Sequence, residues 1–410
     1  MPTHVWAMIV AQRVGNFNRV CFFWVRFMSE NERFALTYNA IRRTIVATFS
    51  LHENGMFVFY LTVTTRKDTL MKKLLSVLSL VLVLLALCLP VMAEAVEPIS
   101  IKVLILPKFE AGDMAGDFPG EAQYYYENYV VGGEEYDIVG GFEDNKLYVK
   151  DGVALYVTGM GKVNSAMSLT AVLMDSRFDF SDAYILSTGC AGSSADYSVM
   201  GDVFVITAAV DYDLGHHADP RELTGEQTTT WFHDESYDSA SVKILNQELM
   251  EKVYNLVKDV KVETTDKTRA FMAAAFPEAD WATRDPQVLR GTTITGDNYW
   301  KGAYDHANAV LMTETYGCPD PYALTEMEDV ALAVVADRLG MLDRFIIIRD
   351  SVNTDAFMNG ATPESLWDPN FEDSLASEES VESADIFATA MKNNFTVGSV
   401  VVDAIVNGTL

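Results

Sequence analysis

The chain has 410 residues, of which 49% are hydrophobic and 11% aromatic, so it can bury a substantial core and general disorder is excluded. Its formal net charge is −28 at pH 7, which argues against nucleic acid as a partner because an acidic surface repels phosphates. The four cysteines show no C-x-x-C or other dense spacing typical of a zinc site.

The first part of the chain differs from the rest. Residues 1–70 are basic on balance and show no steady hydrophobic period, whereas the chain after residue 95 is strongly acidic. Between them, residues 71–95 contain a basic start, an apolar run and a small-residue cleavage site, which is the order of a secretory signal peptide. A membrane anchor is the alternative, but the apolar run is short for a transmembrane helix.

We therefore expect residues 71–95 to be a signal peptide and the mature protein to be exported to the periplasm, the cell surface or the medium. Met71 is then the natural initiator, and residues 1–70 are a wrongly assigned upstream extension. A genuine basic pre-region is the alternative. Either way, residues 1–70 take no part in the prediction of the fold.

Residues 96–410 are interpreted as a single α/β domain. Apolar runs of strand length end in glycines or polar turns and lead into helical patterns, which is typical of a mostly parallel sheet covered by helices. The predicted strands cover residues 99–106, 153–157, 183–186, 202–210 and 345–348. Helices are predicted over residues 164–174, 242–260, 330–339 and 383–405, and an acidic, serine-rich loop over residues 367–382.

Two glycine-rich segments follow predicted strands, at the end of the sheet where such proteins bind ligands. The first, from Gly159 to Lys162, resembles a phosphate-binding turn but lacks the Walker spacing, and a tight strand-to-helix turn capped near Asn164 is favoured. The second, from Gly189 to Gly192, has small residues that would let a base or a sugar approach the backbone. A crowded turn under a neighbouring helix is the alternative, and the two uses are compatible.

Two other segments have side chains that suit a nucleoside. Asn298 and Tyr299 combine an amide for a base edge with an aromatic face for stacking, and an aromatic core at a loop end is the alternative. The segment from Thr325 to Glu328 fits a capping box. Glu328 therefore either closes its own helix or accepts the two hydroxyls of a ribose diol.

Acids and histidines gather within nine residues, but they give no metal pattern. The cluster consists of Asp211, Asp213, His216, His217 and Asp219. Neither the order nor the spacing matches a known metal site, so solvated loop residues and helix caps are favoured and we expect no metal. The two cysteines of the mature part, at positions 190 and 318, are interpreted as separate thiols in preference to a disulfide.

In their order along the chain, these segments resemble the nucleoside phosphorylase and nucleosidase superfamily, and in particular its purine nucleoside permease branch. The segments concerned are 158–164, 189–192, 201–203, 296–298, 326–328 and 349–353, with 120–127 and 349–353 closest to the permeases. The likeness covers nearly all of residues 100–410. It implies a single α/β domain around a central mixed, partly barrel-like sheet flanked by helices, with no cofactor.

The resemblance also implies roles for individual residues. Glu328 would hold the 2′ and 3′ hydroxyls of the ribose, with Met327 beside it. The residues near the base would be Gly189, Cys190, Ala191, Gly192, Asn298 and Tyr299. Relatives carry a base-protonating aspartate where this chain has Asn353, so Asp355, two residues on, is the candidate acid. Glu110 falls where nucleosidases hold a glutamate that activates water.

The resemblance leaves two functions open. Ser187 and Thr188 stand where several phosphorylases place an arginine, so water is favoured over phosphate as nucleophile. The mature part has no apolar helix of about 20 residues and is not expected to form a membrane pore by itself. We expect an exported purine nucleoside-recognising protein that supports nucleoside uptake, cleaves the N-glycosidic bond, or does both.

A non-catalytic nucleoside-binding component of an uptake system is the alternative. A metal-dependent hydrolase that uses His216 and His217 is a third and less favoured hypothesis. The expected partner is a purine nucleoside, and contact with a membrane is expected only through the signal segment or an uptake system. Assembly into a homo-oligomer is left open.

Overall fold

The computed structural model describes residues 97–196, 198–362, 364 and 383–410, together with four strands within residues 25–63. The segment predicted to be a signal peptide and most of the acidic loop predicted before the last helix lie outside the described residues. The chain divides into two compact units, Met1–Ala95 and Val96–Leu410.

The first unit contains a four-stranded antiparallel sheet. Its strands follow one another in chain order: β1 (Val25–Met28), β2 (Arg33–Ala40), β3 (Arg43–Leu51) and β4 (Phe57–Val63). Residues 1–70, whose sequence shows no steady hydrophobic period, thus contain regular strands, because short runs rich in Thr, Val, Ile, Phe and Tyr pair as local hairpins. The interpretation of this region as an upstream extension stays a prediction.

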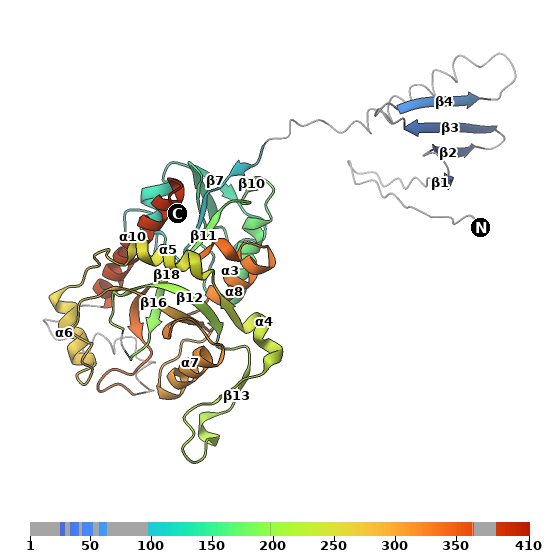
Figure 1. The fold of residues 1–410 in the computed structure, drawn as a ribbon. Helices are drawn as coiled ribbons and strands as arrows, with labels where there is room; N and C mark the ends of the chain where they lie inside the picture. Colours follow the sequence, from blue (N-terminus) through green and yellow to red (C-terminus); the bar gives the residue numbers. More distant parts are fainter. Residues whose placement is uncertain are drawn as a thin grey trace. The chain divides into compact units, whose positions relative to one another are not determined.

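The second unit is built on a ten-stranded mixed sheet (Figure 1). Its strands are β6 (Val103–Leu106), β7 (Glu134–Asp137), β8 (Lys146–Lys150), β9 (Val153–Leu155), β11 (Tyr184–Ser193), β12 (Val203–Asp211), β15 (Val242–Ile244), β16 (Val288–Thr295), β17 (Tyr322–Glu326) and β18 (Phe345–Thr354). All five predicted strands are found. β6 and β12 are buried along their whole length, which explains why β6 is entirely apolar and β12 is apolar except for Thr207 and Asp211.

Five of these strands close into a ring. The order is β12, β16, β17, β11 and β18, and β18 closes it by pairing with both β11 and β12. The β11–β18 pair is parallel and the β17–β11 pair is antiparallel. Register shifts in the β11–β18, β12–β16 and β16–β17 ladders supply the bends that closure requires. The expectation of a mixed, partly barrel-like sheet is confirmed.

Ring closure also explains a difference from the sequence analysis. The segment from Gly189 to Gly192 was expected to be a turn after a short strand, but it continues β11 as far as Ser193. It does so because Gly189 pairs with Arg349 and Gly192 with Asn353 on β18, so both segments are drawn into one ladder. The residues expected at strand ends therefore line the wall of the ring.

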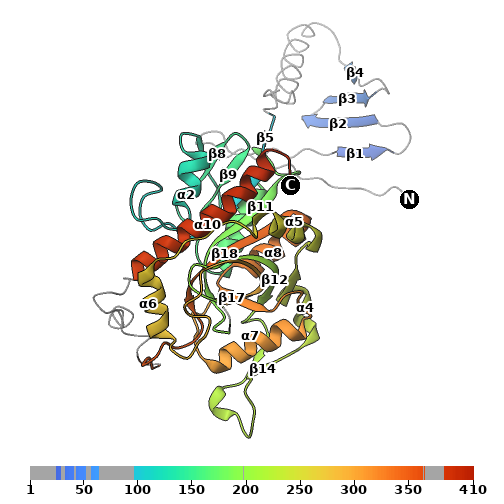
Figure 2. The same ribbon diagram turned by 60° about the vertical axis from the view of Figure 1, so that its left-hand side comes forward.

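Helices cover the sheet on both sides. They are α2 (Gln123–Tyr125), α3 (Lys162–Leu173), α4 (Asp238–Ser241), α5 (Gln247–Val257), α6 (Asp266–Ala275), α7 (Ala303–Thr315), α8 (Asp329–Arg338) and α10 (Ser383–Val406). Figure 2 shows α10 running across β11 and β18, while α3 packs against α8. The helix predicted over 242–260 begins later, because Val242–Ile244 pairs with β12 as β15.

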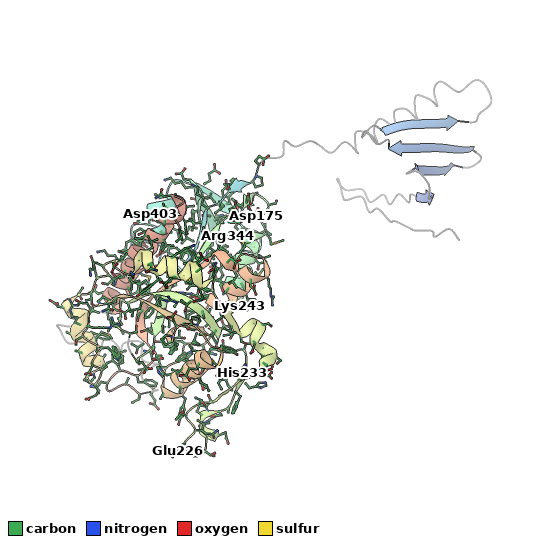
Figure 3. The ribbon with its side chains drawn as sticks, in the orientation of Figure 1. Asp175, Glu226, His233, Lys243, Arg344 and Asp403 are labelled. Carbon is green, nitrogen blue, oxygen red and sulfur yellow. The ribbon has the colours of Figure 1, made fainter. Side chains whose placement is uncertain are left out.

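Charged side chains join elements at the surface of this unit. Lys243 and Arg344, both labelled in Figure 3, bind Asp337 (2.6 Å) and the carbonyl of Ser181 (2.5 Å), respectively. Among the helices of the described part of the chain, none is long and apolar enough to cross a membrane.

Candidate functional site

A buried arginine on β18 lies at the centre of the candidate site. The side chain of Arg349 is 1% exposed, and its Nε lies 2.9 Å from Oδ2 of Asp329. Its Nη2 lies 3.0 Å from Oε2 of Glu328 and 3.2 Å from Oε2 of Glu326, and Nη1 donates to the carbonyl of Cys190 at 2.9 Å. Arg349 therefore joins the acidic segment after β17 to the glycine segment of β11. A guanidinium buried this deeply needs such partners.

Glu326, rather than Glu328, closes the start of α8. One carboxylate oxygen of Glu326 accepts the backbone N–H of Glu328 at 2.6 Å and that of Asp329 at 2.7 Å. Its other oxygen accepts the hydroxyls of Thr293 and Thr295. Glu328 is the N-cap residue but makes no capping bond with its side chain. The capping-box interpretation is therefore wrong, because Thr325 lies in strand β17 and cannot cap the helix.

The carboxylate of Glu328 is buried against the first glycine-rich segment and Arg349. It is 3% exposed. Its Oε1 accepts the backbone N–H of Gly161 at 3.0 Å, and its Oε2 binds Arg349. Gly161 has φ +88° and is the N-cap of α3, so the turn here presents its N–H to a carboxylate. Asn164 does not cap this helix; its side chain donates to the carbonyl of Met160 at 2.8 Å.

A buried lysine lies against Ser187 and Thr188, the two positions where an arginine would have indicated a phosphate site. Lys108 Nζ donates to Ser187 Oγ at 2.7 Å and to the carbonyl of Thr188 at 2.8 Å, and lies 3.8 Å from Asp329. Ser187 Oγ donates to Asp329 at 2.5 Å. Burial, together with the nearby charge of Arg349, lowers the pKa of Lys108 to about 8.

The three carboxyl groups beside Arg349 are not equivalent. Burial, followed by the charge of Asp329, raises the pKa of Glu326 to about 7. Burial also raises the pKa of Glu328, although Arg349 opposes the shift. Burial acts in the same direction on Asp329, but Arg349 and Lys108 outweigh it and hold the pKa of Asp329 below its usual value. Three carboxyl groups thus share two cations in a dry environment.

Two glutamates near the start of α2 have different surroundings. Glu110 accepts four backbone N–H groups, those of Ala111 (2.9 Å), Gly120, Ala122 (2.9 Å) and Gln123 (2.6 Å). Glu121 is 5% exposed and accepts the N–H groups of Cys190 (2.8 Å) and Lys108 (2.6 Å). A methyl group added at Gly189 would lie 2.4 Å from its carboxylate.

Glu121 therefore lies directly against the glycine segment, and the sequence analysis missed it as a site residue. The only signal in the sequence was that Glu121 lies in the segment 120–127, which resembles the purine nucleoside permeases. Glu110 instead fastens the loop between the two glutamates to the start of α2.

The two residues expected near the leaving base, Asn353 and Asp355, lie at the end of the β11–β18 pair. Asn353 is half-buried, and a methyl group added at Gly192 would lie 2.7 Å from its Oδ1, so the amide faces the glycine segment. Asp355 is 1% exposed; its Oδ1 accepts the N–H of Ala195 at 3.0 Å, and its Oδ2 accepts Tyr322 Oη at 2.8 Å. The same Oδ2 lies 2.7 Å from Nδ1 of His306.

The loop before α7 is fastened to the first glycine turn. Asp297 accepts the backbone N–H of Lys162 at 2.8 Å, and Lys162 Nζ lies 2.8 Å from both Asp211 and Asp213. Asn298 donates to Asp213 at 3.3 Å. These contacts bring the segments 159–162, 211–213 and 296–298 together beside Glu328.

The remaining predicted site residues differ in their exposure to solvent. Tyr299 is 61% exposed, with Lys301 Nζ 5.7 Å from its ring centroid. Met327 is half-buried after β17, and Ala191 is buried within β11. Cys190 and Cys318 are both free thiols, in agreement with their interpretation as separate cysteines.

The histidines near residue 216 bind protein groups. His216 Nε2 lies 3.2 Å from Asp234, and His217 Nε2 lies 2.7 Å from the carbonyl of Tyr212. Among the side chains that the structure describes, no three His, Cys, Asp or Glu residues are arranged to hold a metal ion.

Comparison with known proteins agrees with the order of the motifs. The family model described as purine nucleoside permease (NUP) matches residues 100–409. The probable purine nucleoside permease C285.05 of Schizosaccharomyces pombe is 28% identical over 243 residues, which cover 52% of this chain and 68% of the relative. The purine nucleoside permease of Candida albicans is 26% identical over 211 residues, 47% of this chain and 52% of the relative. The match thus spans about half the length of the Candida protein.

Nucleosidases are also similar to this chain. A 5′-methylthioadenosine/S-adenosylhomocysteine nucleosidase of Anoxybacillus flavithermus is 27% identical over 197 residues, which cover 48% of this chain and 66% of the relative. The solved structure of the corresponding enzyme of Neisseria meningitidis is 16% identical with a TM-score of 0.44, and covers 74% of this chain and 98% of that one.

Proposed function

The chain belongs to the purine nucleoside permease family, and we propose that it binds a purine nucleoside beside Arg349 and cleaves the N-glycosidic bond with water. The observation that carries this proposal is the shortage of positive charge in the buried cluster. Three carboxyl groups face two cations there, and burial raises the pKa of Glu326 to about 7. A ribose that develops oxocarbenium character would supply the missing positive charge, and the fixed carboxylates would stabilise it most strongly in the transition state.

Glu328 is proposed to hold the ribose. Each oxygen of its carboxylate already accepts one hydrogen bond, from Gly161 or from Arg349. A carboxylate offers about four acceptor positions, so one remains on each oxygen for the adjacent 2′ and 3′ hydroxyls. The contacts with Gly161 and Arg349 fix the side chain in place before the sugar arrives, which reduces the entropic cost of binding.

Glu121 is proposed to orient and deprotonate the attacking water. Glu110, the candidate from sequence, accepts four backbone N–H groups, which fill the roughly four acceptor positions of a carboxylate. Glu121 accepts two and lies against Gly189, so it keeps acceptor positions next to the glycine segment. Phosphate is a poorer nucleophile here, because both cations are already engaged by carboxylates and a dianion would meet net repulsion.

The base is proposed to lie between the wall formed by Gly192 and Asn353 and the exposed ring of Tyr299. Asn353 can hydrogen-bond a purine through its amide but has no proton to give. That property favours a second candidate function, a non-catalytic nucleoside-binding component of an uptake system. The two candidates share the same binding residues and differ only in turnover.

The proposal includes export and self-association. Export is supported by the signal-peptide order of residues 71–95. Self-association is supported by an apolar stripe that follows α3, at Met160, Val163, Met167 and Met174, whose exposed fractions are 55%, 77%, 60% and 67%. The stripe carries no charge, so in a chain of net charge −28 it is a face where a second copy meets little repulsion.

The test is release of free base from inosine and adenosine, with and without phosphate, by the purified protein and by Glu328→Ala. We expect release without phosphate, no stimulation by phosphate, and loss of release in the variant. Release only when phosphate is present would reject hydrolysis. Tight nucleoside binding without any release, at high protein concentration and long incubation, would select the binding component.

A further inference from the structure

A histidine lies between two carboxylates at the end of the β11–β18 pair. His306, in the first turn of α7, has Nδ1 2.7 Å from Oδ2 of Asp355 and Nε2 3.2 Å from Oδ2 of Asp196. Asp355 continues the ladder beyond β18, because its N–H donates to the carbonyl of Ser193 at 2.9 Å. The imidazole is thus anchored to the same strand pair that carries Asn353.

Strand geometry places this histidine close to the proposed base position. A register shift in the β11–β18 ladder between Ser351 and Asn353 interrupts the alternation of side chains along β18, and beyond it Asn353 and Asp355, two residues apart, point to the same side. Asp355 lies two residues, or about 7 Å, beyond Asn353. An imidazole attached to Asp355 can bridge much of that distance toward the base proposed to lie against Asn353.

His306 is the group in this arrangement that has a proton to give. Asp355 accepts three hydrogen bonds, from Ala195, Tyr322 and His306, which is the pattern of a carboxylate. Its hydrogen bond raises the pKa of His306, and Asp196 acts in the same direction. The ring of Tyr322 packs edge-on against the imidazole, with the two ring centroids 5.6 Å apart.

The two nitrogens of His306 differ in accessibility. Nδ1 faces Asp355, whose side chain is fully buried, and Nε2 faces Asp196, whose side chain is 66% exposed. The exposed carboxylate can turn away into solvent at little cost, because a surface ion pair contributes about 0–1 kcal/mol. Nε2–H is then available to a ligand while Asp355 keeps the ring in place.

We propose that His306 is the general acid that protonates the departing purine, with Asn353 orienting the base. This inference depends on the proposed N-glycosidic cleavage. As the bond between C1′ and the base breaks, its electron pair stays on the base, and a ring nitrogen takes the proton from Nε2. The oxygen of water bonds to C1′, its proton passes to Glu121, and Glu121 then releases that proton to solvent. His306 regains a proton from solvent through Asp196, and the products are ribose and neutral base.

The test compares two substrates in the full-length protein and in His306→Gln. Inosine needs a proton on its leaving base, whereas the base of 7-methylguanosine already carries a positive charge in the substrate and leaves as neutral 7-methylguanine without one. We expect the variant to lose roughly 10²–10⁴-fold in kcat on inosine, the usual contribution of a general acid, and less than about tenfold on 7-methylguanosine. The kcat on inosine should also fall as pH rises through the pKa of His306, and the profile for 7-methylguanosine should stay flat.

Two further variants sharpen the test. His233→Gln is the matched control, because His233, labelled in Figure 3, pairs with Asp238 at 2.9 Å and contacts no proposed site residue. It should keep wild-type rates on both substrates. Asn353→Asp in the His306→Gln background should restore cleavage of inosine, since it supplies an acid at the neighbouring position on the same face.

Three results would overturn the inference. Equal losses on both substrates would mean that His306 only supports the structure. An unchanged rate on inosine would mean that another group supplies the proton. No release from either substrate by the unmodified protein would instead reject the proposed cleavage itself, and the proton donor with it.

Discussion

Removal of the buried guanidinium is the sharpest test of how the site is held together. In Arg349→Met, the methionine keeps an unbranched apolar stem but offers no donor to Glu326, Glu328 or Asp329. Three buried carboxyl groups are then left with Lys108 alone, which lies 3.8 Å from Asp329. Breaking a buried ion pair from one side typically costs about 3–5 kcal/mol, because the remaining charge stays desolvated.

The cost should depend on pH in a definite direction. In the wild-type protein, the pKa of Glu326 is already raised from 4.5 to about 7. A carboxyl with a raised folded-state pKa contributes stability below its unfolded pKa and loses that contribution as pH rises through the folded one. Without Arg349 the carboxyl pKa values rise further. The difference in unfolding free energy between variant and wild type should therefore be larger at pH 8 than at pH 5.

Urea unfolding at pH 5 and pH 8 measures both quantities. We expect a loss of about 3–5 kcal/mol at pH 8 and a clearly smaller loss at pH 5. Arg221→Met is the control, because the Arg221 side chain is 87% exposed and its pair with Asp219 belongs to the class worth about 0–1 kcal/mol. A loss near 1 kcal/mol at pH 8, or equal losses at both pH values, would refute the role of Arg349 as the cation that stabilises the three buried carboxylates.

Further predictions concern substitutions at four positions. Glu328→Gln should reduce the rate of base release roughly 10²–10³-fold with little change in melting temperature, because it weakens charge stabilisation of the ribose; a steady-state assay of free base measures this. Glu121→Gln should reduce kcat at least as much as Glu328→Gln does. Glu110→Gln should instead lower the unfolding free energy by about 1–3 kcal/mol and leave kcat of the folded protein unchanged. Met167→Asp should shift the protein to monomers in sedimentation velocity runs, and an unchanged assembly would remove α3 as the contact face.

The sequence was sufficient to predict the family and the general architecture. Strands such as Val203–Asp211 are apolar over most of their length, and such runs are typical of strands buried on both faces. Closure of the ring could not be predicted from such apolar runs. It depends on β18 pairing with β11 and β12 at once, and pairing partners leave no mark in the hydrophobic pattern of either strand.

The errors at the site have the same physical origin. Glu328 and Glu326 are both acids near a helix start, and the capping-box spacing selected the wrong one, because residues up to Glu326 belong to a strand. Glu110 and Glu121 both precede α2, and only the folded loop between them decides which one reaches Cys190. His306 had no local signal, since its partner Asp355 is 49 residues away.

The strand directions in the ring also explain how the proposed ribose site and the proposed proton donor are placed relative to each other. β17 is antiparallel to β11, and β11 is parallel to β18, so β17 and β18 run in opposite directions on either side of β11. Glu326 at the end of β17 therefore meets Arg349, while Tyr322 at its start meets Asp355. The two contacts are four residues apart on β17, a distance of about 13 Å. That distance suits a nucleoside held with its ribose at the charged cluster and its base toward His306. A shift of β17 by two residues in its register would leave the same side chains facing inward, but it would separate Glu326 from Arg349 and Tyr322 from Asp355. The proposed activity therefore depends on where these residues lie along their strands, and not on residue type alone.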